Sequence, residues 1–205
     1  MNDRRQRNRG FSLVEILVVV AIASSLIMVV SSLSGNVSGL NSLVSSQLQS
    51  KSDIAQTLQI VTTEIRSASP SQSGAYPIDS AGTSSFSFFS DIDKDGKTDH
   101  VRYFLASTSI MKGVIKPTGT PATYPTSGEV VTDVIDNIVV NATSAPLFTY
   151  YDKNYTGSQA PLAQPIDTSQ IRLVGITFYA DVKPNQGPAP DYFSTVVDIR
   201  NLRDN

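Results

Sequence analysis

The chain of 205 residues contains no cysteine and no tryptophan, and it has only one histidine and three glutamates. The absence of cysteine excludes disulfides, thiol catalysis and cysteine metal sites. A single histidine, His100, leaves little material for acid–base chemistry. No G-x-S-x-G elbow and no pair of metal-binding histidines is present either. We therefore expect a protein that is not an enzyme.

Charge is sparse and unevenly distributed. Four of the sixteen basic residues lie in residues 1–10, together with only one of the eighteen acidic residues. The remainder of the chain is therefore acidic and has no basic surface for a phosphate backbone. We expect no nucleic-acid partner.

A long apolar run follows the arginines. Residues 11–33 contain one charged side chain, Glu15. As a helix this run would span ~34 Å, enough to cross a hydrocarbon core of ~30 Å, and the arginines predict that its amino-terminal end stays in the cytoplasm. An unpaired carboxylate costs roughly 2.5–3.5 kcal/mol at the centre of such a helix and less near its end. We therefore expect a membrane helix in which Glu15 has a functional role that offsets the cost of its charge.

Three interpretations of this segment compete. A secretory signal peptide would have a shorter apolar core and a small-x-small cleavage site, for which AIASS is a weak candidate. A plain signal anchor accounts for the hydropathy but leaves Glu15 unexplained. The third interpretation depends on the residues immediately around the start of the run.

GFSLVE, preceded by arginines and followed by a long apolar run, resembles the prepilin signature of type IV pilins and type II secretion pseudopilins. The resemblance implies that a prepilin peptidase cleaves between Gly10 and Phe11 and methylates the new amine on Phe11. It also implies that Glu15 pairs with an amino-terminal charge in the packed filament. This is physically coherent, because cleavage creates a cation, a buried charge needs a partner, and positions i and i+4 share a helix face.

The rest of the sequence indicates an α+β fold. Residues 34–68 have apolar residues at helical spacing, so we expect them to continue the membrane helix to Ala68, where SPSQSGAYP stops it. A separate soluble helix is the alternative. Beyond Ser84 the pattern changes to short strands divided by proline, glycine and threonine turns, although EVVTDVIDNIVV fits a short helix or a pair of strands equally well.

This order of elements predicts four parts: a leader (1–10), a membrane and filament-core helix (11–33), an amphipathic half of the same long helix (34–68) and a β-rich head (69–205). A long amino-terminal helix packed on a small antiparallel sheet is the pilin-like arrangement that the resemblance implies. TTEIRSA, FTYYD and the closing IRLVGITFYAD and FSTVVDIRNL resemble, more specifically, the large minor pilins of the PilW and pseudopilin J type.

The segment DIDKDGKTD is the remaining pattern of chemical interest. It places carboxylates at Asp91, Asp93, Asp95 and Asp99 around a turn at Gly96. Calcium takes six to eight oxygen ligands, whereas magnesium prefers to keep its waters. We expect calcium bound by these four aspartates and the Lys97 backbone carbonyl, as in the short DxDxDGxxD loops of integrin-type propellers, which the segment resembles. The alternative is a solvated hairpin tip with acidic residues that favour turns.

Taken with the resemblance, these features predict a structural subunit, a minor pilin or pseudopilin, of a type IV pilus or a related secretion or competence filament. The implied partners are other pilin subunits, the prepilin peptidase, the pilus assembly platform and the membrane, which residues 11–33 would cross. The implied location is first the cytoplasmic membrane, as a single-pass precursor, and then a filament on the cell surface. Two alternatives remain: a calcium-dependent adhesin at a filament tip, and a membrane-anchored exported enzyme that pairs His100 with the adjoining Asp99.

Overall fold

The structure is a computed structural model that describes residues 11–139, 145–181 and 189–202, with the backbone alone described at 33–43. The chain divides into two compact units, Met1–Leu48 and Gln49–Asn205, which are described separately. The leader residue Gly10, one side of the expected cleavage site, lies outside the described residues.

One α-helix, α1 (Leu13–Arg66), covers both the apolar run and the amphipathic segment that follows it. The expected continuous helix is therefore present, and a separate soluble helix is not what the chain forms. Its bounds are two residues tighter at each end than the expected 11–68. Helical hydrogen bonding persists slightly further, because the Ala68 N–H donates to the Ile65 carbonyl at 3.1 Å.

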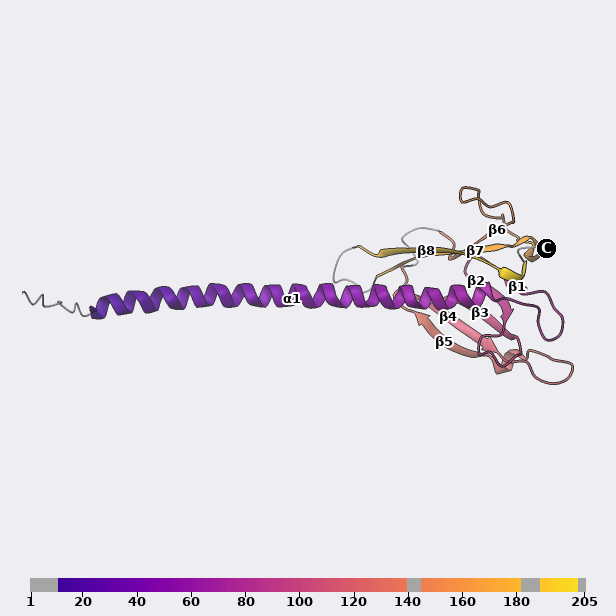
Figure 1. Ribbon diagram of the computed structural model, residues 1–205, viewed down its shortest axis with the longest axis horizontal. Coiled ribbons are helices and arrows are strands. Elements are labelled where there is room, and N and C mark those ends of the chain that lie inside the picture. Colours follow the sequence, from indigo (N-terminus) through magenta and orange to yellow (C-terminus); the bar gives the residue numbers. More distant parts are fainter. Residues whose placement is uncertain (1–10, 140–144, 182–188, 203–205) are drawn as a thin grey trace, which may run out of the picture. The chain divides into compact units, whose positions relative to one another are not determined.

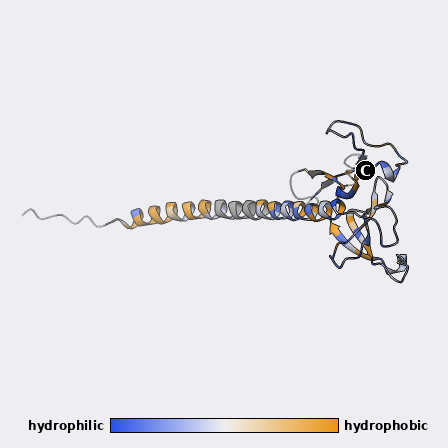
Figure 2. Cartoon of the chain, turned by 45° about the vertical axis from the view of Figure 1, so that its right-hand side comes forward, coloured by the Kyte–Doolittle hydropathy of each residue, from blue (hydrophilic) through white to orange (hydrophobic). Residues whose placement is uncertain are grey.

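The first part of α1, in the first unit, is predominantly apolar. Leu13–Ser32 has a mean hydropathy of 2.8, and none of this segment is buried against the rest of the chain. Figure 2 shows the resulting continuous hydrophobic colouring along the first part of the helix. A predominantly apolar helix that is not buried in its own chain requires an apolar environment, either lipid or other helices.

The second unit contains two antiparallel sheets (Figure 1). The first sheet is a meander in the order β1-β2-β3-β4-β5, and the second has the order β6-β7-β8. The strands of the first are β1 (Ile78–Ala81), β2 (Ser85–Ser90), β3 (Asp99–Ala106), β4 (Ser109–Ile115) and β5 (Val130–Ile135). The strands of the second are β6 (Phe148–Tyr151), β7 (Leu173–Ala180) and β8 (Asp191–Asp198). Short 3-10 turns occur at Thr126–Gly128, Thr168–Gln170 and Arg200–Leu202.

Both sheets and the end of α1 contribute to one hydrophobic core. Ile54, Leu58, Val61 and Ile65 of α1 pack into it at helical spacing, and Ile65 is completely buried, whereas Ile60 lies on the exposed side of the helix. Phe86 of β2 lies at the centre, with its ring centroid 5.2 Å from that of Phe88 and 5.6 Å from that of Tyr150. Phe86 and Phe88 of FSFFS and Phe148 and Tyr150 of FTYYD therefore belong to the core that the two sheets share.

The strand pattern is confirmed in outline, with two differences. EVVTDVIDNIVV, which was ambiguous, forms β5 and then a single bridge between Ile138 and Ala180, so it is neither a helix nor a strand pair. The strand β1 was not expected, because IDSA is only four residues long and pairs with β2 through an irregular register. A period of two is not recognisable over so few residues.

Candidate functional site

The amino-terminal segment is the first candidate site. The first helical hydrogen bond runs from the Ile16 N–H to the Ser12 carbonyl at 3.2 Å, and α1 begins at Leu13. Phe11 therefore lies ahead of the helix, and the expected placement of Phe11 and Glu15 on one helix face is not present. Glu15 lies in the first turn, where the helix dipole favours a negative charge.

Polar side chains deeper in the apolar segment are satisfied by the helix itself. The hydroxyls of Ser24, Ser25 and Ser32 donate to backbone carbonyls three or four residues earlier, at 2.7–2.9 Å. Such bonds let serine lie in an apolar environment at little cost. Glu15 carries the only charge in Leu13–Ser32, so it is the one side chain there that requires a partner from outside this segment.

The acidic loop is the second candidate site, and it connects β2 to β3. Ser90 and Asp99 pair across the two strands, so residues 91–98 form the turn of a hairpin. Gly96 has a φ of +83°, a conformation that glycine adopts without strain. The loop is held from outside by Gln72, whose Nε2 donates to the Gly96 carbonyl at 3.2 Å, and by the Tyr124 hydroxyl, which donates to the Thr98 carbonyl at 2.7 Å.

The structure brings three of the expected ligands together. One carboxylate oxygen from each of Asp91, Asp93 and Asp95 lies within 4.8 Å of the others. Backbone N–H groups of the loop orient these carboxylates: the Gly96 N–H donates to Asp91 Oδ2 at 3.0 Å and the Lys97 N–H donates to Asp95 Oδ1 at 2.8 Å. The loop thus presents its acidic groups on one side of a tight turn.

Asp99 differs from the other three aspartates in being 2 % exposed. Burial, followed by the charge of Asp93, raises the pKa of the Asp99 carboxyl to about 6. The Oδ2 atom has no hydrogen-bond partner among the described residues. An orphaned buried carboxylate oxygen is uncommon in native proteins and indicates a missing partner.

Sequence reasoning missed Lys116, which follows β4 and donates from its Nζ to Asp93 Oδ2. This contact lowers the pKa of the exposed Asp93 and raises that of Lys116. Only the three-dimensional pairing of β3 with β4 brings Lys116 to the loop. A non-local pairing of this kind leaves no short-range signal in the sequence.

His100 and Asp99 do not form the pair that an enzyme would need. Neighbouring residues of a strand point to opposite faces, so Asp99 is buried while His100 reaches Asp79, with 3.1 Å between Nε2 and Oδ2. The rings of Phe89 and Tyr124 pack within 5.1 Å and 6.3 Å of the imidazole. The interpretation of Asp99 and His100 as partners was wrong.

Glu64, also missed, joins α1 to the first sheet. Its Oε2 accepts from the Tyr103 hydroxyl and its Oε1 from Lys112 Nζ, both at 2.6 Å. Burial, with the charge of Glu64, raises the pKa of Tyr103. This network fixes the rotation of the second half of α1 on the sheet.

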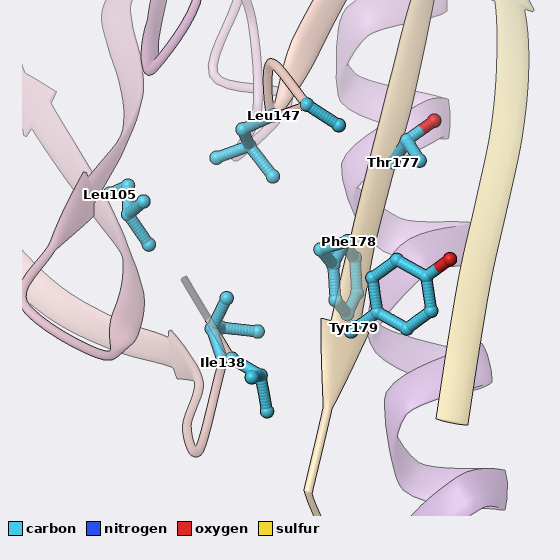
Figure 3. Close-up of a pocket in the computed structure, with 8 residues that line it drawn as sticks. Leu105, Ile138, Leu147, Thr177, Phe178 and Tyr179 are labelled. Atoms are coloured by element: carbon cyan, nitrogen blue, oxygen red, sulfur yellow. The ribbon is translucent and has the colours of Figure 1, made fainter. Parts of the chain in front are cut away.

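The cavity in Figure 3 has no features of a substrate site. Its volume is about 50 Å³, far below the ~300 Å³ at which small-molecule sites begin. Leu105, Ile138, Leu147 and Phe178 surround the gap, and the hydroxyl groups of Thr177 and Tyr179 are directed away from it (Figure 3). The gap is a packing defect between the sheets.

Comparison with known proteins gives one finding at the amino-terminal site. No curated protein matches the chain. Residues 5–31 match a family model described as "Prokaryotic N-terminal methylation motif". The match covers Gly10, Phe11 and Glu15 and stops near the end of the apolar segment. It supports the resemblance of this segment to type IV pilins and pseudopilins.

Proposed function

We propose that this chain is a structural subunit of a type IV pilus or a related pseudopilin filament, processed by a prepilin peptidase and assembled through its amino-terminal helix. The single observation that carries the proposal is the methylation motif at residues 5–31, coupled to a helix whose apolar surface is exposed. The motif and the exposed helix are consistent with each other, because a prepilin peptidase removes only the leader and leaves the apolar helix attached to the head.

The chemistry proposed for the amino-terminal site is cleavage between Gly10 and Phe11, followed by methylation of the new amine. Phe11 lies outside α1 and is 75 % exposed, so its backbone is accessible to a peptidase and a methyltransferase. Proteases and modifying enzymes act on extended, exposed backbone, which a residue ahead of the first helical turn provides. The precursor is expected in the cytoplasmic membrane, and the assembled subunit on the cell surface.

Assembly would bury the exposed apolar side chains of Leu13–Ser32 against the same segment of other subunits. Within lipid these helices gain no hydrophobic free energy by associating, so close packing of side chains has to hold them together. Outside the membrane, the same apolar surface would cost about 25 cal/mol per Å² if it faced water, which favours keeping it buried between subunits. Glu15 would then lie in an apolar bundle, where its charge requires an opposite charge. The Phe11 amine of a neighbouring subunit is the cation that processing supplies.

We assign the chain more narrowly to the minor subunits, of the PilW or pseudopilin J type. Support comes from the head, in which two sheets and the end of α1 share one core. Glu64 within TTEIRSA and the buried Phe148 and Tyr150 of the FTYYD segment have structural roles there, which is consistent with the segments that carry the resemblance. The role in the filament is structural: subunits pack, and no reaction is catalysed.

A Glu15 series tests the assembly step. In the native organism, Glu15→Gln should be processed and inserted normally but be depleted from sheared filaments, because the amine loses its charged partner while the side chain keeps its shape. Glu15→Asp, which keeps the charge, should retain part of the incorporation. Asp53→Asn is the matched control: it also neutralises an acidic residue of α1, but an exposed one in the second unit, and it should be incorporated normally. Normal incorporation of Glu15→Gln would contradict the proposed charge pair.

A further inference from the structure

The buried carboxylate of Asp99 points to a ligand that the protein atoms do not supply. Asp99 begins β3 on the strand face that also carries the buried Val101 and Tyr103. Its Oδ2 is buried and accepts no hydrogen bond among the described residues. A buried carboxylate with an unsatisfied oxygen is costly unless a cation or a donor reaches it.

Asp99 lies at the base of the acidic loop. It pairs with Ser90 at the base of the hairpin, so the loop turns directly beyond it. The charged groups that act on the Asp99 carboxyl are all members of the loop or of its immediate surroundings: Asp93, Lys116, Asp95 and Asp91. Asp99 is not one of the three aspartates whose oxygens lie within 4.8 Å of each other, so it adds a fourth carboxylate at the base of the loop, beside that group.

The negative charge of this region is concentrated on a few neighbouring carboxylates. Lys116 places one ammonium on Asp93 Oδ2. Residues 91–99 contain four aspartates and two lysines, Lys94 and Lys97, so that with Lys116 one negative charge stays unbalanced. The oxygens of three of the aspartates lie within 4.8 Å of each other. Carboxylates this close repel unless a cation lies between them.

All potential ligand atoms in the acidic cluster are oxygens. The cluster contains carboxylates and backbone carbonyls, without a histidine or a thiolate, which suits a hard divalent cation. The carbonyls of Gly96 and Thr98 already accept hydrogen bonds from Gln72 and Tyr124. The Lys97 carbonyl between them is the backbone ligand expected from the sequence.

We propose that the β2–β3 loop is a calcium site. Asp91, Asp93 and Asp95 are its exposed ligands, and Asp99 is its buried ligand. Without calcium, the Lys116 ammonium binds the Asp93 carboxylate, and calcium displaces it. Calcium rather than magnesium fits this donor set because calcium accepts many carboxylate oxygens in flexible geometry, while magnesium keeps most of its waters. Lys116 acts as an internal competitor, so calcium binding and release of the ammonium are coupled. The site is independent of the filament role proposed above.

The test uses the full chain in detergent, freed of metal with a chelator and titrated with calcium chloride or magnesium chloride. Near-ultraviolet circular dichroism follows the head alone, because all eight tyrosines lie between Tyr76 and Tyr192 and tryptophan is absent. Calcium at millimolar concentration should raise the melting temperature by several degrees, since it binds only the folded form. Magnesium should produce a much smaller shift. No calorimetric heat and no shift with calcium would overturn the site, and an equal shift with magnesium would overturn the assignment to calcium.

Two variants with opposite effects test the roles of Asp99 and Lys116. Asp99→Asn should melt at a higher temperature without calcium, because a buried charge is removed, and should bind calcium about tenfold more weakly or worse, because a charged ligand is lost. Lys116→Gln should melt at a lower temperature without calcium and show a larger calcium shift. Asp133→Asn, on β5 opposite Met111, is the matched control and should respond like the unmodified chain. Unchanged calcium affinity in Asp99→Asn would overturn its role as a ligand, and a smaller calcium shift in Lys116→Gln would overturn the competition.

Discussion

Replacing Glu64 with alanine removes the shared acceptor of two groups that cannot easily find another. The Tyr103 side chain is almost completely buried, and the side chains of Lys112 and Glu64 are 17 % and 13 % exposed. A buried hydroxyl left without a partner costs about 1–3 kcal/mol, and breaking a well-buried ion pair costs about 3–5 kcal/mol. Because the Lys112 ammonium retains some access to water, we expect a total loss of about 3–5 kcal/mol in the free energy of unfolding.

The assay is thermal unfolding followed by the tyrosine circular dichroism of the head. A unit the size of Gln49–Asn205 has an unfolding entropy of about 0.3 kcal/mol/K, so Glu64→Ala should lower the melting temperature by about 9–15 °C. Lys51→Ala is the matched control on the same helix. Its ion pair with Asp191 joins side chains that are 43 % and 33 % exposed, and its loss should cost at most about 1 kcal/mol.

A double-mutant cycle separates the Glu64 network from general damage to the helix. In the unmodified chain, Tyr103→Phe should cost about 1.5–3 kcal/mol because it removes a hydrogen bond to a charged acceptor. In the Glu64→Ala background, the same change should be neutral or stabilising, because it removes an orphaned hydroxyl. Equal costs of Tyr103→Phe in both backgrounds, or a loss below about 1 kcal/mol for Glu64→Ala, would refute the reasoning.

Two further predictions concern the head. The pKa of Asp99, raised to about 6 in the folded chain, means that the folded state holds this proton more tightly than the unfolded state. The stability that this proton contributes without calcium should therefore be complete below about pH 4 and lost as the pH rises to about 6. The melting temperatures of the unmodified chain and of Asp99→Asn should diverge over that range of pH. Parallel curves would contradict the raised pKa of Asp99. Gly113→Ala should cost about 1–2 kcal/mol, because its new Cβ would lie 2.0 Å from Glu129 Oε1 and displace the carboxylate that Arg102 binds through two nitrogens. The cost of Gly113→Ala in denaturant unfolding should shrink when Glu129 is also alanine, and an unchanged cost would show that the clash lies elsewhere.

Local patterns predicted the elements that are long or strongly periodic. The helix over Leu13–Arg66 follows from a continuous apolar run that becomes an amphipathic period, and strands such as Leu173–Ala180 follow from β-branched and aromatic content. The four-residue strand Ile78–Ala81 is too short to carry a period of its own. The ends of α1 differ from expectation by two residues, which is the range over which helix ends fray and pass into 3-10 turns.

Contacts between segments that lie far apart in the chain could not be predicted from the sequence. The acidic loop was recognised because Asp91, Asp93 and Asp95 alternate within one turn, and the structure brings these three together. Whether they bind calcium stays a prediction. Lys116 and Glu64 were missed because their partners come from strand pairing and helix docking. The Asp99–His100 pairing was wrong because adjacent residues of a strand face opposite sides.

The proposed processing at the amino terminus is the central claim, and intact mass spectrometry tests it most directly. The chain should be purified from the membranes and filaments of its native organism, where the processing enzymes are present. We expect a single mature species that begins at Phe11 and carries one methyl group on its amine. A species that begins at Met1, or one that begins within or after the apolar run of Leu13–Ser32, would contradict the account.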